Sequence, residues 1–158
     1  MDPVKIPKMS KTEYDALVHR QYIARIGFGA CGGAYVAPFV YVFDGKFLYF
    51  LSSRYGRKVL YFKNNPHVSV EIEEYSPDLS TFRFISLQGR LEELQDPGDT
   101  RRVREMFIGL IRKRGLYPGV ISAFGHSPDD PVESIAREER SMVWKLAGVQ
   151  DIVALKNA

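Results

Sequence analysis

The chain has 158 residues, a length that points to one domain, and its 45% hydrophobic and 26% charged residues are ordinary values for a globular protein. No apolar stretch approaches the roughly 18 residues that span a bilayer, and the opening MDPVKIPKMS lacks the apolar segment of a signal peptide, so we expect a cytoplasmic protein with no membrane partner. The single cysteine, Cys31, excludes an internal disulfide and a cysteine-based zinc site, and the net charge of +3 is a small excess.

A helix is predicted from Lys11 to about Arg20, because Ser10 and Glu13 have the spacing of a capping box. Residues 22–29 then have the pattern of a strand, whose glycines indicate a bulge or a close approach of another backbone. The chain therefore opens with one helix followed by one strand.

Residues 32–53, GGAYVAPFVYVFDGKFLYFLSS, contain two aromatic and β-branched runs joined by Asp44-Gly45, a strong signal for a two-residue hairpin turn. We therefore expect two antiparallel strands here. Pro38 lies in the first of them and has no N–H to donate to a ladder, which predicts an edge position or a bulge near the middle of that strand.

A short helix is predicted from about Arg57 to Asn64, where NNP before Pro66 ends it. Two strands follow, at residues 67–74 and 82–94, with a polar loop between them. We expect these neighbours to be antiparallel as well.

A long amphipathic helix is predicted between Asp96 and Gly115, because apolar residues recur with helical spacing at Val103, Met106, Phe107, Leu110 and Ile111. This spacing places the arginines of TRRVREMFIGLIRKRG on an outward, solvated face. A further short helix at residues 132–139 and one or two strands within residues 141–155 are expected to complete the chain.

Five to seven strands, mostly antiparallel neighbours with helices inserted between them, predict a mainly β domain of the α+β type. Its expected form is a small antiparallel barrel with peripheral helices. A doubly wound α/β sheet fits poorly, because the helices do not alternate with the strands.

Arg57 and Lys58 form an adjacent basic pair in the first turn of the short helix, where backbone N–H groups are unpaired and the helix dipole favours an anion. Ser52 and Ser53 bring two hydroxyl donors a few residues upstream. Together these groups are suited to a dianionic phosphate monoester. The alternative is that Arg57 and Lys58 are ordinary surface charges.

The order of GGAYVAPFVYVFDGKFLYFLSS, GRK, NNPHVSVEI and QGRLEEL resembles the pyridoxamine 5′-phosphate oxidase-like family of FMN-binding split barrels, and most of all its short, nitroimidazole-reductase-like members. The resemblance spans about Ser10 to Leu94 and, more weakly, the terminal VWKL. It implies a six- to seven-stranded antiparallel split β-barrel with peripheral helices, formed by residues 1–158 as one domain. It also implies a homodimer with FMN in two clefts at the subunit interface.

The resemblance assigns site residues position by position. Arg57 and Lys58 match the phosphate-binding basic pair, and Ser52, with Ser53 beside it, matches a hydroxyl position that contacts the phosphate. The strand that lines the flavin ring corresponds to residues 36–40, which gives the ring contacts Val36, Pro38, Phe39 and Val40. The tyrosines of the hairpin belong most simply to strand faces of the barrel and its dimer interface: Tyr35, Tyr41 and Tyr49.

Two further positions carry alternatives. Trp144 matches an aromatic residue that approaches the flavin from the partner subunit, and the alternative is that it fills the barrel. In the fifth strand the family often has a polar residue facing the flavin, where a gapless comparison puts Phe84. Gln88 takes that role if the register differs, and is otherwise an exposed strand residue.

The activity that the resemblance implies is that of an FMN-dependent oxidoreductase with a small-molecule substrate. Two electrons would come from a reduced nicotinamide or flavin donor and pass to a small, planar acceptor, and neither a dedicated acid or base nor a metal is expected. Members that oxidise pyridoxamine phosphate have a longer C-terminal region with Arg and His residues for the substrate phosphate. This chain ends WKLAGVQDIVALKNA, so we do not expect that activity.

Three alternatives remain open from the sequence. A split barrel can use a deazaflavin or haem, although no axial-ligand motif for haem is evident, and a flavin-binding protein can act as a carrier or sensor without turnover. A small barrel can also bind single-stranded nucleic acid. We expect no nucleic-acid partner, because the positive charge concentrates on one helix and the strands carry Glu71, Glu73, Glu74, Glu92 and Glu93.

Overall fold

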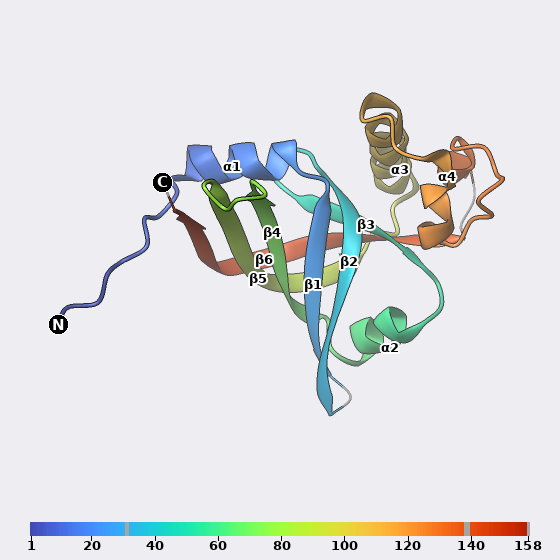
Figure 1. Cartoon of the computed structure of the whole chain (residues 1–158). Coiled ribbons are helices and arrows are strands. Elements are labelled where there is room, and N and C mark those ends of the chain that lie inside the picture. The colour runs from blue at the N-terminus through green and yellow to red at the C-terminus, as the bar shows by residue number, and fades with distance from the viewer. Residues whose placement is uncertain (31, 138–139, 158) are drawn as a thin grey trace.

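The computed structural model describes residues 1–30, 32–137 and 140–157. Over these residues the strands are β1 (Ile23–Ala30), β2 (Gly33–Phe43), β3 (Leu48–Ser53), β4 (His67–Tyr75), β5 (Phe82–Glu93) and β6 (Ser141–Lys156). The helices are α1 (Lys11–Arg20), α2 (Arg57–Asn64), α3 (Pro97–Lys113), α4 (Ser134–Arg137) and the 3₁₀ helix η1 (Pro118–Phe124). The described strands close into an antiparallel barrel in the order β1-β2-β3-β6-β5-β4 (Figure 1). The predicted fold class is therefore confirmed.

The last strand is one continuous element of 16 residues, whereas the sequence left open one strand or two. Gly148 (φ 59°) and Asp151 (φ 50°) bend the chain within it. The pairing of β5 with β6 shifts register on both sides of Gln88, which pairs with Gln150. β6 thus continues across an irregular stretch that separates its two predicted halves.

The hairpin between β2 and β3 is confirmed, but it turns one residue later than predicted. The Asp44 N–H donates to the Phe47 carbonyl (3.2 Å), so Gly45 (φ 95°) and Lys46 are the central residues of the turn. The Asp44 carboxylate accepts the N–H groups of Lys46 (2.9 Å) and Phe47 (2.7 Å). Asp44 therefore stabilises the turn from its flank through its side chain.

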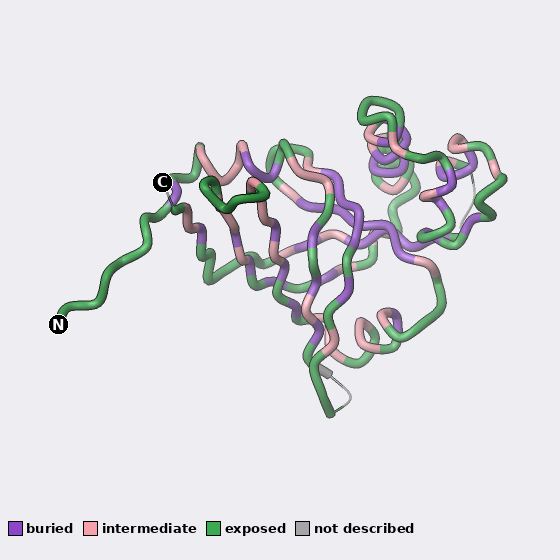
Figure 2. The backbone as a smooth tube through the Cα atoms, viewed as in Figure 1, coloured by how far each residue is buried: buried purple, intermediate pink, exposed green. Residues whose placement is uncertain are grey.

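Two apolar clusters hold the fold together. The first fills the barrel and includes Phe28, Phe50 and Trp144. The second lies between the outer face of β2, β3 and β6 and the helices α3, η1 and α4, which sit together on one side of the barrel (Figure 1). Buried and exposed positions alternate along several strands, as the colours of Figure 2 show. Val40 and Val42 of β2 belong to the second cluster, so this strand supplies both cores.

Helix α3 has the predicted apolar face, on which Val103, Phe107 and Ile111 are buried. The expectation that its arginines all point to solvent is wrong for Arg104, which is buried on the same side. Its guanidinium donates to the hydroxyl (2.6 Å) and carbonyl (2.6 Å) oxygens of Ser141. Arg104 therefore attaches α3 to the start of β6.

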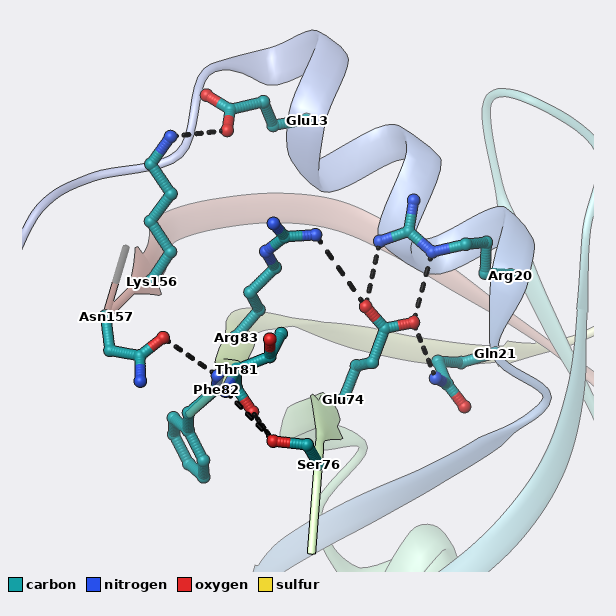
Figure 3. A network of polar contacts seen from close by, with 10 residues as sticks. All are labelled: Glu13, Arg20, Gln21, Glu74, Ser76, Thr81, Phe82, Arg83, Lys156 and Asn157. Atoms are coloured by element: carbon teal, nitrogen blue, oxygen red, sulfur yellow. Dashed lines mark hydrogen bonds and ion pairs between the residues drawn. The ribbon is translucent and has the colours of Figure 1, made fainter. Parts of the chain in front are cut away.

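Helix α1 crosses one end of the barrel and has the predicted capping box. Ion pairs join it to two strands, β6 and β4 (Figure 3). Lys156 of β6 contacts Glu13 (2.6 Å), while Glu74 of β4 accepts from Arg20 of α1 (3.1 Å) and lies 3.8 Å from Arg83 of β5. Both the first and the last turn of α1 are thus tied to the barrel.

Some expectations fall outside the described residues. Cys31 is one, and the predicted helix at 132–139 is another in part, because its described portion is α4 at Ser134–Arg137. Within the described residues, no helix is long and apolar enough to cross a membrane.

Candidate functional site

The N-terminus of α2 is built without a side-chain cap or an acidic residue. Gly56 is the N-cap, with φ at 106°, and no side chain of the described residues caps the first turn with a hydrogen bond. Glycine tolerates this backbone conformation where other residues are strained. The first N–H groups of the helix and the positive end of its dipole therefore favour an anion at this position.

Arg57 and Lys58 are held by aromatic rings. The exposed Arg57 guanidinium carbon lies 5.7 Å from the centre of the Tyr35 ring, and the half-buried Lys58 Nζ lies 5.2 Å from the centre of the Phe39 ring. Neither side chain has a carboxylate partner among the described residues. Burial lowers the pKa of Lys58. Two positive charges are thus available to an anionic ligand.

A cavity of about 170 Å³ lies beside Lys58. Residues of β1, β2, β3, α2 and η1 line it, and apart from Lys58 they are apolar: Ile23, Pro38, Phe39, Val40, Leu51, Ala123 and Phe124. Four predicted site residues therefore meet here, namely Pro38, Phe39, Val40 and Lys58.

Strand β2 makes room for this cavity by separating from β3. It pairs with β1 from Gly33 to Val40, but with β3 only from Tyr41 to Phe43. Pro38 pairs with Arg25 of β1 and lies in the part of β2 for which the described ladders give no second neighbour. The predicted edge position of Pro38 is confirmed, and its missing N–H costs no ladder bond there.

Val36 is 62% exposed and lies two residues from Pro38 on the same face of β2. Phe39 is buried and packs within the barrel cluster. An apolar ligand at the cavity can therefore extend over Pro38 toward Val36, whereas the Phe39 side chain belongs mainly to the barrel core.

Ser52 and Ser53 lie directly before the loop that leads to α2, and both hydroxyls donate to backbone carbonyls. The Ser52 hydroxyl is buried and bonds to the Ser53 carbonyl (2.8 Å), and the Ser53 hydroxyl bonds to the Tyr55 carbonyl (3.0 Å). In this arrangement they stabilise the loop. Either hydroxyl would have to rotate to donate to a phosphate.

Trp144 is buried inside the barrel, and this position differs from the one beside a flavin that the resemblance implies. Its ring stacks on Phe62 (4.7 Å between ring centres) and lies 5.8 Å from Phe39. Its Nε1 has no hydrogen-bond partner among the described residues. The structure therefore favours the alternative in which Trp144 fills the barrel.

Gln88 is exposed and lines a different pocket, which has a volume of about 460 Å³ and is also lined by Gly27 and Gly29. Phe84, the gapless match to the polar family position, is half-buried with its ring 6.0 Å from that of Phe82. Within one chain, neither residue lines the Lys58 cavity.

Tyr35 lies at the candidate site, whereas the sequence indicated only a strand face of the barrel and its dimer interface. Its ring lies 5.3 Å from that of Tyr61 on α2 and 6.1 Å from that of Phe28 on β1, beneath the Arg57 guanidinium. The available signal was the two-residue period, which puts Tyr35 and Phe39 on one face of β2. That both would meet the basic pair depends on where α2 docks.

Comparison with protein families gives a match over most of the chain. The family model described as pyridoxamine 5′-phosphate oxidase matches residues 10–134. The chain belongs to the pyridoxamine 5′-phosphate oxidase family. Membership in this family confirms the resemblance that the order of motifs indicated. A search of curated proteins gives no match.

Solved structures share the fold of this family member over nearly its whole length. An FAD-binding protein from Mesorhizobium loti has a TM-score of 0.69 at 20% identity, covering 98% of this chain and 100% of its own. The heme storage protein HutZ from Vibrio cholerae has a TM-score of 0.65 at 14% identity, and the match covers 92% of this chain and 94% of HutZ. A candidate 5-nitroimidazole antibiotic resistance protein from Bacteroides thetaiotaomicron has a TM-score of 0.61 at 15% identity, and the match covers 96% of this chain and 90% of that protein. At these identities the likeness is one of fold.

Proposed function

We propose that this chain binds FMN and acts as a cytoplasmic, homodimeric FMN-dependent oxidoreductase. The observation that carries the proposal is the pair Arg57 and Lys58, two cations at a helix N-terminus beside an apolar cavity, for which the described residues provide neither a carboxylate partner nor a side-chain cap. An FMN phosphate is a dianion joined to a planar, largely apolar ring system. The chemistry of the site matches both parts of that molecule.

The residues divide between the two parts of the ligand. Arg57, Lys58 and the first N–H groups of α2 would hold the phosphate through charge-assisted hydrogen bonds. Val36, Pro38 and Val40 would contact the ring along the outer face of β2. The two halves of the site come from segments joined by the β2–β3 hairpin, so one supersecondary unit supplies both.

FMN, when bound, supplies two-electron redox chemistry. The chain's own residues bind and orient it and leave one ring face for a small, planar acceptor. The electron donor in this proposal is a reduced nicotinamide or flavin. No residue is assigned as an acid or base, in keeping with a role in binding and orientation.

The size of the cavity supports the dimer in this proposal. A volume of about 170 Å³ is below the roughly 300–1,000 Å³ of typical small-molecule sites, so one chain encloses only part of a flavin. Val36 at 62% exposure and Ile23 at 40% leave apolar surface at its border. A second copy covering this border would complete the enclosure.

The first test is the absorption spectrum of the purified protein, followed by titration with FMN and with riboflavin, which lacks the phosphate. Replacing both cations (Arg57→Ala with Lys58→Ala) is expected to weaken FMN binding by at least about 100-fold, because two charge-assisted hydrogen bonds of about 1.5–3 kcal/mol each are lost. Riboflavin binding should not change. The matched control is Arg101→Ala with Lys113→Ala, which removes the same charge from exposed positions of α3.

Four outcomes would reject the proposal in whole or in part. Unchanged FMN affinity in the double variant would remove the phosphate site, and a Soret band would identify a haem protein. Preferential reconstitution with a deazaflavin would replace the cofactor. An FMN complex that neither NADH, NADPH nor reduced flavin can reduce would make the protein a non-catalytic flavin binder.

A further inference from the structure

A second cavity, of about 300 Å³, opens at the barrel end that α1 crosses. Its inner wall is formed by buried aliphatic side chains: Val18, Leu48, Ile85, Leu87 and Leu146. None of the residues that line it also lines the cavity beside Lys58. Its volume is at the lower end of the range of roughly 300–1,000 Å³ found for small-molecule sites.

The wall that α1 contributes is fixed in place. The contacts of Glu13 with Lys156 and of Arg20 with Glu74 tie both ends of the helix to the strands (Figure 3). Tyr14 and Val18 on its inner side line the cavity. The helix therefore contributes one wall of the cavity while both of its ends contact the strands.

Apolar side chains continue from the interior to the mouth of the cavity. Val149 and Ile152 line the mouth and are 43% and 44% exposed, on the bent part of β6. Asp151, between them, has φ at 50°, in the left-handed region that Asp adopts more readily than most residues with a side chain. Apolar surface is therefore exposed at the rim on both sides of this bend.

Two lysines line the mouth of the cavity, and only one of them forms an ion pair among the described residues. Lys11 and Asp15 form an ion pair with each other (2.5 Å). Lys46, on the hairpin turn, has its Nζ 5.1 Å from the centre of the Phe47 ring and no carboxylate partner among the described residues. The mouth is therefore suited to a ligand with one negative charge.

We propose that this cavity is a second binding site, for a small amphiphile with an apolar chain and a single carboxylate, such as a medium-chain fatty acid. The chain enters between α1 and β6 and contacts the aliphatic inner wall. The carboxylate stays at the mouth beside Lys46. This site is independent of the flavin site, so either proposal can fail without the other.

Decanoate is the probe, titrated into the full chain by calorimetry below its micellar concentration. We expect one decanoate per chain, with octanoate binding about tenfold more weakly because two buried methylene groups are lost. Decanol should bind more weakly than decanoate. Lys46→Glu should weaken decanoate binding about fivefold, because one partly exposed ion pair is lost. Lys63→Glu on α2 is the control for this change of charge.

A charge at the rim tests the location of the site. Ile152→Glu should abolish decanoate binding, whereas Val153→Glu, equally exposed at 46% on the same strand but outside the cavity, should leave it unchanged. Val149→Glu provides a second rim variant should Ile152→Glu fail to fold, as judged by circular dichroism. No saturable binding, equal losses in the rim and control variants, or equal affinity for decanol would overturn the proposal.

Discussion

Arg57 and Lys58 are held against aromatic rings, and this affects what they can bind. A carboxylate partner would neutralise each charge, whereas a ring face fixes the position of a cation and leaves its charge for a ligand. Tyr35 is in turn packed between Tyr61 and Phe28, so its ring has little freedom to move. The proposed phosphate site is thus preorganised by residues that do not themselves carry charge.

Replacing Tyr35 tests this positioning role. Tyr35→Leu is expected to weaken FMN binding about threefold, since an exposed cation–π contact contributes about 0.5–1 kcal/mol. Tyr35→Phe keeps the ring and should retain wild-type affinity. Riboflavin affinity separates positioning from a general loss of structure, because it should not respond to either change. Equal effects on FMN and riboflavin would contradict the role.

Trp144 gives a second prediction at the level of single residues. Trp144→Phe should lower the free energy of unfolding by about 1–3 kcal/mol, because a smaller ring leaves a void in the barrel. Part of this loss is offset because the unpartnered Nε1 is removed. FMN affinity should stay at the wild-type value. A large loss of FMN affinity with unchanged stability would instead place Trp144 beside the flavin.

Glycines show how turns and helices place different demands on one residue type. Gly45 has φ at 95° in the hairpin turn, and Gly109 lies within α3. At both positions a Cβ would meet no heavy atom of the described residues within 4 Å, apart from the adjacent backbone. Gly45→Ala should lower the free energy of unfolding by about 1 kcal/mol through strain, and Gly109→Ala should raise it by about 0.5–1 kcal/mol. Urea denaturation of both variants measures the difference, and equal signs would contradict the assigned turn.

The attachment of α1 to the barrel should depend on pH. The hydrogen bond from Arg20 is the main reason that the pKa of the Glu74 carboxyl lies below its usual value of 4.5. A lowered folded-state pKa contributes stability above the unfolded-state pKa, and this contribution is lost as the pH falls through the folded-state value.

Glu74→Gln removes this pH-dependent contribution. Between about pH 6 and pH 3, the wild-type chain should lose about 1 kcal/mol more of its free energy of unfolding than the variant does. Glu105→Gln, which breaks an exposed pair within α3, is the control and should change this loss little. The measurement is urea denaturation at each pH, and parallel losses in wild type and Glu74→Gln would reject the role of the ion pair.

Elements whose ends are set by neighbouring residues were predicted well. Lys11–Arg20 and Arg57–Asn64 match the structure, because a capping box and a proline act within a few residues of the helix ends. The turn after β2 was predicted one residue too early. Asp44 stabilises this turn from its flank through its side chain and is not one of its two central residues. Arg104 was misassigned because its acceptor, Ser141, lies 37 residues away in sequence.

The candidate site was predictable in part for the same reason. The basic pair and the edge proline have local signals, and the resemblance supplied their order. The contact of Arg57 with Tyr35 and the inward orientation of Trp144 depend on how α2 docks and how β6 twists around the barrel. Those are properties of the closed barrel, to which residues distant in sequence contribute equally.

The whole molecule is expected to be a dimer whose formation and FMN binding depend on each other. Sedimentation should give twice the chain mass of 18.0 kDa. Val36→Glu puts a charge on the apolar border of the flavin site, and should shift the chain toward monomer and weaken FMN at low protein concentration. Leu79→Glu, at a comparably exposed loop position, is the control. A monomer that binds FMN with wild-type affinity would contradict this coupling.

The separation of β2 from β3 has a consequence beyond ligand binding. A strand with a neighbour on one side only presents free backbone groups, along which a strand of another chain can add, and repeated addition leads to aggregation. Pro38 lies within that open stretch, near its end at Val40, and withholds one of the donors that an incoming strand would need. The same proline that faces the proposed flavin thus protects the protein from edge-to-edge association during the time that the site is empty.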